Sequence, residues 1–254
     1  MKKSYIILAI ILVSFMIIMY LIFGFNSKKE TYIVIGNDVK WKLTDKWEDD
    51  NTSVQFPTST KFNVYDETGY LGNYIIKHHN DKWYVFDESD NFIKTSGDIF
   101  ATNDSAIVLE DYEVTELNND DLKQLDEILK EYDILDYTLL SINKKIEFDF
   151  NQDGENEELF IVSNLFSEEN NGEDLFSLIY YVNNNKVQII KENIVSKENE
   201  LDSQYSDVGY ILNVDRNKKY ELIIKNECFN NVCEPCYEMY KLKFGKYKSI
   251  KSCE

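Results

Sequence analysis

The apolar residues divide the chain into one long hydrophobic segment and a series of short ones. Residues 5–25 contain no charged side chain and are dominated by Ile, Leu, Met and Phe. As an α-helix these 21 residues span about 32 Å, which matches a hydrocarbon core of about 30 Å. The pattern therefore predicts a single transmembrane helix close to the N-terminus.

A cleaved signal peptide is the alternative interpretation of this segment. Its apolar core is normally roughly 7 to 15 residues long and is followed by a small-x-small cleavage motif. Here the apolar run is longer, it ends in the sequence Gly-Phe-Asn-Ser at 24–27, and no cysteine follows it to carry a lipid anchor. We therefore interpret the segment as an uncleaved signal anchor.

Basic residues flank the anchor on both sides. Lys2 and Lys3 precede it, and Lys28 and Lys29 follow it. The free N-terminal amine tips this balance towards a cytoplasmic N-terminus, so that the long C-terminal part is exported. The sequence thus predicts a single-pass protein of the cell membrane with an extracytoplasmic domain.

After the anchor, β-branched and aromatic residues alternate with clusters of Asp, Asn and Gly, as is typical of short strands joined by turns. In the first part of the domain we predict strands at 31–35, 39–43, 61–65, 74–77, 83–86, 99–101 and 106–109. This part contains an internal echo at an offset of 36 residues, since Trp47 and Trp83 occupy equivalent positions. The echo predicts two similar hairpins, each anchored by a tryptophan.

One segment has helical periodicity instead. Apolar residues recur on one face at Leu122, Leu125, Ile128, Leu129 and Tyr132, and either Asn119 or Asp120 can cap the helix. Beyond it, strands are predicted in two successive groups of four, at 146–150, 159–166, 176–182 and 187–191, then at 209–214, 221–228, 237–244 and 247–250. The helix is expected to separate two β-rich parts.

Together these patterns predict a mainly β fold with one N-terminal transmembrane helix and one amphipathic helix. The strands are expected to form blade-like four-stranded antiparallel meanders, and an α+β fold with two small β subdomains is the alternative. The expected organisation is a cytoplasmic tail at 1–4, the anchor at 5–25, a linker at 26–30, an N-terminal β subdomain at 31–117, and a helix with two β repeats at 118–254.

Charge narrows the range of partners. The chain has 46 acidic and 27 basic residues and a net charge of −19 at pH 7. Such a surface repels phosphate backbones, so nucleic acid is excluded as a partner.

The four cysteines, Cys228, Cys233, Cys236 and Cys253, all lie in the last 27 residues. In an exported chain such a cluster is typical of two disulfides, for which three connectivities are possible. A four-thiolate zinc site is the alternative, because Cys233 and Cys236 have C-x-x-C spacing, although no second C-x-x-C completes it.

The segment between the first two strands of the second part has the pattern of a calcium-binding loop. Oxygen-bearing side chains stand at positions 1, 3, 5 and 9 of the segment, at Asp149, Asn151, Asp153 and Glu157. Gly154 permits a sharp turn at position 6, and the carbonyl of Glu155 can supply a ligand at position 7. An EF-hand would need a glutamate at position 12, so the loop is of another kind; a plain acidic turn is the alternative.

A loop of this pattern between two strands resembles the FG-GAP and VCBS repeats of integrin-like β-propellers and exported bacterial proteins. The resemblance covers residues 145–164 and implies that Asp149, Asn151, Asp153, the Glu155 carbonyl and Glu157 hold a structural calcium ion. A degenerate second copy follows at an offset of 64 residues within 209–225, with Asn213, Asp215, Asn217, Lys218 and Glu221 in the corresponding positions. Asparagine replaces aspartate at two of its ligand positions and Lys218 stands where glycine belongs, which puts calcium binding there in doubt.

Catalytic motifs are sparse. His78 and His79 are the two histidines of the chain, and adjacent strand residues point to opposite faces, so a shared site is not favoured. We therefore expect a non-catalytic binding, adhesion or envelope-interaction module, whose partners are the membrane and a cell-surface protein or glycan. The alternative is an exported glycan-active enzyme that uses two carboxylates.

Overall fold

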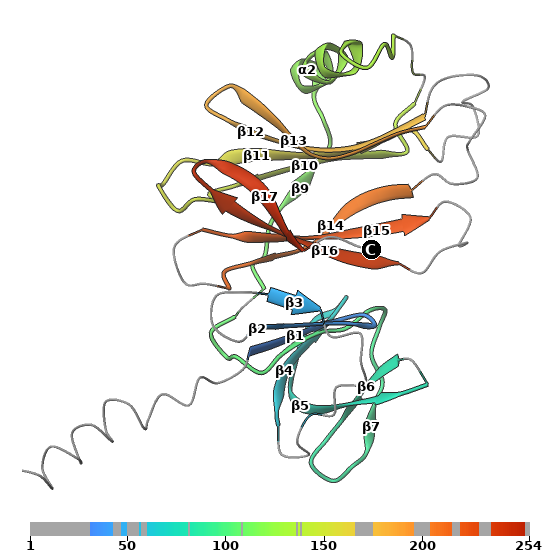
Figure 1. Ribbon diagram of the computed structural model, residues 1–254, viewed down its shortest axis with the longest axis vertical. Coiled ribbons are helices and arrows are strands. Elements are labelled where there is room, and N and C mark those ends of the chain that lie inside the picture. The colour runs from blue at the N-terminus through green and yellow to red at the C-terminus, as the bar shows by residue number, and fades with distance from the viewer. Residues whose placement is uncertain are drawn as a thin grey trace, which may run out of the picture. The chain divides into compact units, whose positions relative to one another are not determined.

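The computed structural model describes residues 31–42, 47–49, 56, 60–80, 82–107, 109–135, 137, 139–165, 175–195, 204–214, 219–228 and 235–251 (Figure 1). The predicted transmembrane segment, 5–25, lies outside this part of the chain. Within the described part, no helix combines the length and the apolar character that a membrane crossing requires.

The described residues form two compact units. The first contains most residues up to Asn103, and the second contains Ile35–Asp38 and the chain from Asp104 onward. The fold is mainly β, with three sheets and one described helix, which confirms the predicted class. Residues 104–117 were predicted to belong to the N-terminal subdomain, but they are part of the second unit.

The N-terminal part forms an eight-stranded sheet in the order β3-β2-β1-β8-β4-β5-β6-β7. Its strands are β1 (Thr31–Ile35), β2 (Asp38–Lys42), β3 (Trp47–Asp49), β4 (Phe62–Asp66), β5 (Gly69–His79), β6 (Lys82–Phe86), β7 (Phe92–Ile93) and β8 (Phe100–Thr102). Alternate residues of β4 are buried, as in a strand with one face on a core, and Val64 packs there with Val34 and Val85.

The 36-residue echo corresponds to two hairpins of identical register. Lys42 pairs with Trp47 in the β2–β3 hairpin, and His78 pairs with Trp83 in the β5–β6 hairpin. The imidazole ring of His78 lies 4.9 Å from the Trp83 ring. Lys42 and Trp47 of the first hairpin thus correspond to His78 and Trp83 of the second, at the predicted offset of 36 residues.

The second unit contains two more sheets. One has the order β13-β12-β11-β10-β9 and the other the order β14-β15-β16-β17. Their strands are β9 (Val114–Thr115), β10 (Ile142–Phe148), β11 (Glu157–Ser163), β12 (Leu175–Asn183), β13 (Lys186–Val195), β14 (Gln204–Leu212), β15 (Glu221–Cys228), β16 (Cys236–Lys243) and β17 (Lys246–Lys251). The strand predicted at 106–109 is not formed; in the described residues there, Leu109 makes an isolated bridge with Leu212.

The five-stranded sheet is covered on both faces, which explains the apolar runs at 159–162 of β11 and 178–182 of β12. Phe160 and Val162 point towards α2 (Asn119–Lys130), where they pack with Leu125 and Leu129. Figure 1 shows this helix lying over the sheet. The intervening residues of β11, such as Ile161, point to the opposite face and pack against the four-stranded sheet. The unit therefore has three layers: helix, sheet and sheet.

The two sheets stack with equivalent faces pointing the same way. At the 64-residue offset Ile224 corresponds to Phe160, yet Ile224 faces the five-stranded sheet whereas Phe160 faces α2. The second hairpins of the two repeats are offset by 60 residues, so Tyr240 corresponds to Tyr180. Tyr240 faces the five-stranded sheet, whereas Tyr180 faces α2. Each repeat thus turns the same face towards the N-terminal end of the stack. On the first repeat that face is covered by α2.

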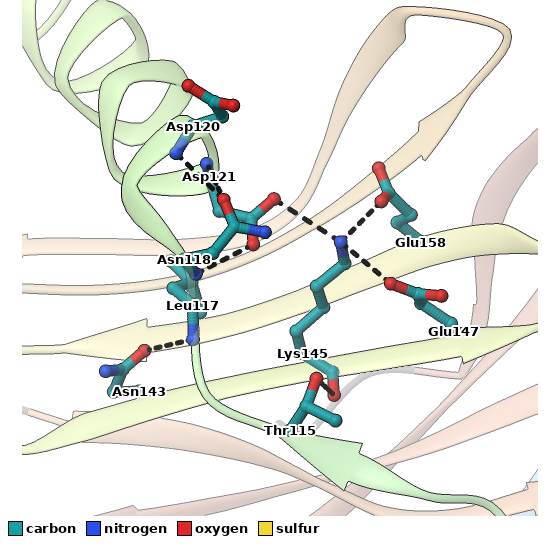
Figure 2. A network of polar contacts seen from close by, with 9 residues as sticks. All are labelled: Thr115, Leu117, Asn118, Asp120, Asp121, Asn143, Lys145, Glu147 and Glu158. Carbon is teal, nitrogen blue, oxygen red and sulfur yellow. Dashed lines mark hydrogen bonds and ion pairs between the residues drawn. The ribbon is translucent and has the colours of Figure 1, made fainter.

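A capping box fixes the start of α2 (Figure 2). The Asn118 side chain accepts hydrogen bonds from the backbone N–H groups of Asp120 and Asp121, and the Asp121 carboxylate accepts one from the backbone N–H of Asn118. The N-cap is therefore Asn118, and not Asn119 or Asp120, the two residues predicted for this position. The helix ends at Lys130, so Tyr132 lies beyond it.

The same Asp121 joins the helix to the sheet through a buried lysine. The Nζ atom of Lys145 lies 2.5 Å from a carboxylate oxygen of Glu158, 2.9 Å from one of Glu147 and 3.4 Å from one of Asp121 (Figure 2). Burial opposes the charge of Lys145, but hydrogen bonds to Glu158 and Glu147 outweigh it and raise the pKa of the lysine. Lys145 therefore remains charged and holds three carboxylates together.

Replacement of Lys145 should destabilise the second unit strongly. Lys145→Ala leaves three neighbouring carboxylates uncompensated, and we expect the free energy of unfolding to fall by about 3–5 kcal/mol. Urea denaturation followed by far-UV circular dichroism, with hydrogen exchange of the α2 amides, measures this loss. The control is Lys144→Ala, because Lys144 pairs with Asp207 at a side chain that is 41% exposed, and its loss should cost about 1 kcal/mol or less. Equal effects of the two variants would contradict the assignment.

Candidate metal-binding loop

The candidate loop occupies the connection between β10 and β11, as the sequence predicts. Two of its residues, Gln152 and Gly154, have positive φ angles of 56° and 95°. Glycine adopts this conformation without steric cost, whereas glutamine does so less readily. The chain therefore turns sharply at the position that the sequence pattern reserves for glycine.

The first carboxylate of the loop binds the backbone of the turn. Asp149 Oδ1 accepts a hydrogen bond from the backbone N–H of Asp153 at 3.0 Å, and Oδ2 accepts one from Gly154 at 2.9 Å. Asp153 Oδ1 accepts a further bond from the backbone N–H of Glu155 at 3.0 Å. These bonds hold the loop in its tight conformation, and both aspartates keep additional lone pairs.

Glu157 differs from the two aspartates because it is buried, at 5% exposure. Its Oε2 accepts a hydrogen bond from the backbone N–H of Phe150 at 2.9 Å, and its Oε1 accepts bonds from the side-chain amides of Asn151 and Asn183. Burial raises the pKa of this carboxyl group, and repulsion from Asp153 and Asp149 adds to the rise. Glu157 thus acts as a clamp across the base of the loop.

The second copy contains the same clamp at the 64-residue offset. Glu221 is 1% exposed, and its Oε2 accepts a hydrogen bond from the backbone N–H of Val214 at 2.9 Å. Glu221 corresponds to Glu157, and Val214 corresponds to Phe150. The 64-residue repeat in the sequence is therefore accompanied by a repeated hydrogen bond. The glutamate at this position has a structural role in both loops.

The remaining positions of the second copy are only partly described. Asp215, Asn217 and Lys218 lie outside the described residues. Asn213, which corresponds to Asp149, is described, and its side-chain oxygen is enclosed without a hydrogen-bond partner in the described part.

The two loops are joined directly. The backbone N–H of Tyr220 donates to the carbonyl of Phe150 at 3.0 Å, and the ring of Tyr220 meets that of Phe148 edge to face, with centroids 4.9 Å apart. The loops of the two stacked repeats therefore lie at the same edge of the stack.

Of the predicted ligand residues, Asp149, Asp153 and Glu157 lie close enough to influence one another electrostatically, and Asn151 is hydrogen-bonded to Glu157. Glu155 is exposed. In the part of the chain that the structure describes, no group of three or more His, Cys, Asp or Glu side chains has the arrangement of a metal site. The carboxylates bind backbone and side-chain N–H groups instead.

Sequence reasoning missed the contribution of β12 to this region. Asn183 donates to Glu157 at 3.0 Å and to the Tyr181 hydroxyl at 3.2 Å. Burial raises the pKa of Tyr181, and the charges of Glu157 and Asp153 add to that effect. In the sequence, Asn183 stands out only as a polar residue at the end of a largely apolar strand. That signal does not reveal Glu157 as its partner.

The cysteines are described in part. Cys228 ends β15 and Cys236 begins β16, and both are disulfide-bonded. Cys233 and Cys253 lie outside the described residues, so the three connectivities remain open.

A pocket of about 340 Å³ lies beside α2, away from the loop. Its lining residues are Leu122, Asp126, Lys130, Ile134, Leu135 and Tyr137. The only carboxylate among them, that of Asp126, accepts a hydrogen bond from the Tyr137 hydroxyl at 2.9 Å. Within the described residues, the lining of this pocket therefore contains one carboxylate, whereas glycoside hydrolysis normally uses two.

With the fold and the loop defined, we compared the chain with known proteins. No family model, no curated protein and no solved structure matches it.

The clamp can be tested at both of its copies. Glu157→Ala and Glu221→Ala each leave a buried backbone N–H, of Phe150 or Val214, without its acceptor. We expect each variant to lower the free energy of unfolding by about 1–3 kcal/mol, measured by urea denaturation in the presence of a chelator. The exposed Glu155 provides the control, and Glu155→Ala should change stability by no more than about 0.5 kcal/mol. A loss at Glu157 without one at Glu221 would refute a common clamp.

Proposed function

We propose that this chain is a membrane-anchored, extracytoplasmic binding module whose second unit is a pair of blade-like β repeats clipped by a structural calcium ion. The transmembrane segment 5–25 anchors it, and its partner is a cell-surface protein or glycan. The observation that carries the calcium assignment is the charge of one loop. The charges of Asp149 and Asp153 repel that of Glu157, and no lysine or arginine of the described chain forms an ion pair with any of the three.

The stacking of the two repeats supports the resemblance to blade-forming families. In a propeller, each blade places one face against the opposite face of its neighbour, and equivalent faces follow one another around the axis. The two sheets of the second unit stack in this sense, and their inter-strand loops meet at one edge through Phe150 and Tyr220. The antiparallel meander of β14–β17 has the strand order of a single blade.

The donor set of the loop suits a hard divalent cation. Carboxylate, amide and carbonyl oxygens are the ligands that calcium prefers, and it takes six to eight of them. We assign this role to the side chains of Asp149, Asn151 and Asp153 and to the carbonyl of Glu155. Glu157 supplies negative charge, and because three N–H donors already bind it, its main contribution is to hold the loop in position.

The binding function follows from the location and surface of the domain. A rigid scaffold that carries variable loops is a common way to present a recognition surface. The chain as a whole carries a net charge of −19, which disfavours a nucleic acid as its partner. Calcium in this arrangement is a structural clip and not a switch.

Calcium should raise the thermal stability of the second unit. Binding to the native state alone, at a concentration of 100 times Kd, stabilises it by about 2.7 kcal/mol, and magnesium should do less because it gives up its waters reluctantly. The melting temperature of the full chain in detergent, with calcium, magnesium or chelator, measures this effect. Asp153→Ala should abolish the response, whereas Asp215→Ala, in the degenerate copy, should leave it intact. Coincident melting curves in calcium and chelator would remove the metal from the proposal.

Cell fractionation tests the proposed location. The chain should remain in the membrane fraction after carbonate extraction, because a 21-residue apolar helix is held by the bilayer and not by surface charge. Protease added to intact cells should digest the C-terminal domain and spare the N-terminus. A mature form that begins near Asn26 would instead identify a cleaved signal peptide. Binding of the anchored domain to a panel of cell-surface glycans and proteins then tests its partner.

A further inference from the structure

The β16–β17 hairpin is the most basic feature of an otherwise acidic protein. Residues 239–250 contain four lysines, Lys241, Lys243, Lys246 and Lys248, and no acidic residue. The net charge of the whole chain is −19. A concentration of positive charge against this background calls for a physical explanation.

Strand register gathers these lysines on one face. Lys241 pairs directly with Lys248, and Lys243 pairs with Lys246. Between them, Leu242 and Tyr247 point to the opposite face and are buried in the core between the two sheets. Like charges directly opposite one another destabilise a sheet, so the arrangement works against folding. The lysines are therefore not explained by the stability of the hairpin.

Three of the four lysines are available to a ligand. Lys243, Lys246 and Lys248 are exposed, and within the described residues none of them takes part in an ion pair. Lys241 lies 3.8 Å from a carboxylate oxygen of Glu221 and is partly neutralised.

The tip of the hairpin adds an exposed aromatic side chain. Phe244 is 97% exposed and has a positive φ of 54°, a conformation that is unfavourable for a bulky side chain. The turn needs positive φ at both central positions, and residues such as Asn and Gly satisfy this need at low cost. Phe244 therefore costs conformational energy and buries no apolar surface.

The equivalent hairpin of the first repeat shows what folding alone requires. At an offset of 60 residues, Asn184 and Asn185 form the same turn with φ angles of 50° and 59°. The pairs that flank it are Asn183 with Lys186 and Tyr181 with Gln188, so that this hairpin carries one lysine in place of four. The aromatic tip and the lysine array are thus peculiar to the second repeat.

We propose that the tip of the β16–β17 hairpin is a docking surface for an anionic lipid bilayer. Lysines near such a surface are attracted to its headgroups, each by about fivefold in affinity, and an exposed aromatic ring is favoured at the boundary between headgroups and acyl chains. The combination of both features in one tip favours a lipid surface over a polyanionic glycan, which would engage the lysines but leave Phe244 in water. This inference rests on the proposed membrane location of the chain.

The experiment places a fluorescent probe at the tip. Full-length Phe244→Trp is reconstituted into vesicles of phosphatidylcholine, with or without phosphatidylglycerol, whose acyl chains are brominated to quench nearby indoles. The signal of the native tryptophans, measured on the unsubstituted chain in the same vesicles, is subtracted. We expect quenching in the anionic vesicles only, and its loss in 1 M salt, where the screening length is about 3 Å.

Two variants sharpen the result. Replacement of Lys243, Lys246 and Lys248 by Gln in the Phe244→Trp background should weaken the contact on the order of a hundredfold. Asn184→Trp, at the matched tip of the first repeat, should not be quenched in either type of vesicle. Equal quenching of both tips, or equal quenching in both lipids, would overturn the proposal.

Other partners give distinct outcomes. A change in the emission of Phe244→Trp with heparin, but none with anionic vesicles, would assign the tip to a polyanionic glycan. A signal that depends on the density of the chain in the bilayer would assign it to a second copy of the protein. Both outcomes reject the lipid surface. Carbonate-resistant flotation of the chain with the vesicles is scored separately, so failure of the anchor and failure of the hairpin contact are distinguished.

Discussion

The second unit depends on one constraint, which is that β11 and β12 must be covered on both faces. Both strands are buried along almost their whole length, and apolar side chains at 159–162 of β11 and 178–182 of β12 point alternately to the two faces of the sheet. One face needs a helix and the other needs a second sheet, and neither layer can be removed without exposing a core. Burial of apolar area on this scale is the main stabilising contribution in a small domain, so the three layers are expected to fold together. The capping box of α2 and the buried Lys145 then fix where the helix lies on the sheet.

The repeat geometry explains why polar residues are retained in a largely apolar stack. Each repeat needs a sharp connection between its first two strands, and the backbone N–H at that connection is buried. Glu157 and Glu221 provide its acceptor in the two copies. A buried glutamate and a buried N–H are each costly when they have no hydrogen-bond partner. A hydrogen bond between the two groups reduces both costs. Asp149 and Asp153 near Glu157 are additional to this need, and the proposed calcium site is built on them.

Much of the fold could be predicted from the sequence because periodicity and turn chemistry act locally. Strand β1 was predicted with its observed bounds, and so was β15. The length of β5 was not: the strand predicted at 74–77 begins at Gly69 and includes Gly72, whose φ of 140° lies beside an irregularity in the pairing with β4. The glutamate clamps and the Lys145 network could not be predicted, since they join residues whose proximity is set by packing. Asn183 reaches Glu157 across 26 positions of sequence, and no local pattern encodes that contact.

The stacking of equivalent faces has a consequence for assembly. A two-fold contact buries the same face of both partners and is complete with two copies. A contact between two different faces leaves one face of each partner uncovered, so further copies can extend it into a ring or a filament. In this chain one end of the stack is closed by α2, whose residues Leu125 and Leu129 occupy the face that another repeat would otherwise cover. The helix therefore covers a sheet face that would otherwise be open to a further repeat. Detachment of α2 would expose this apolar sheet face. Other copies of the chain could then pack on it end to end.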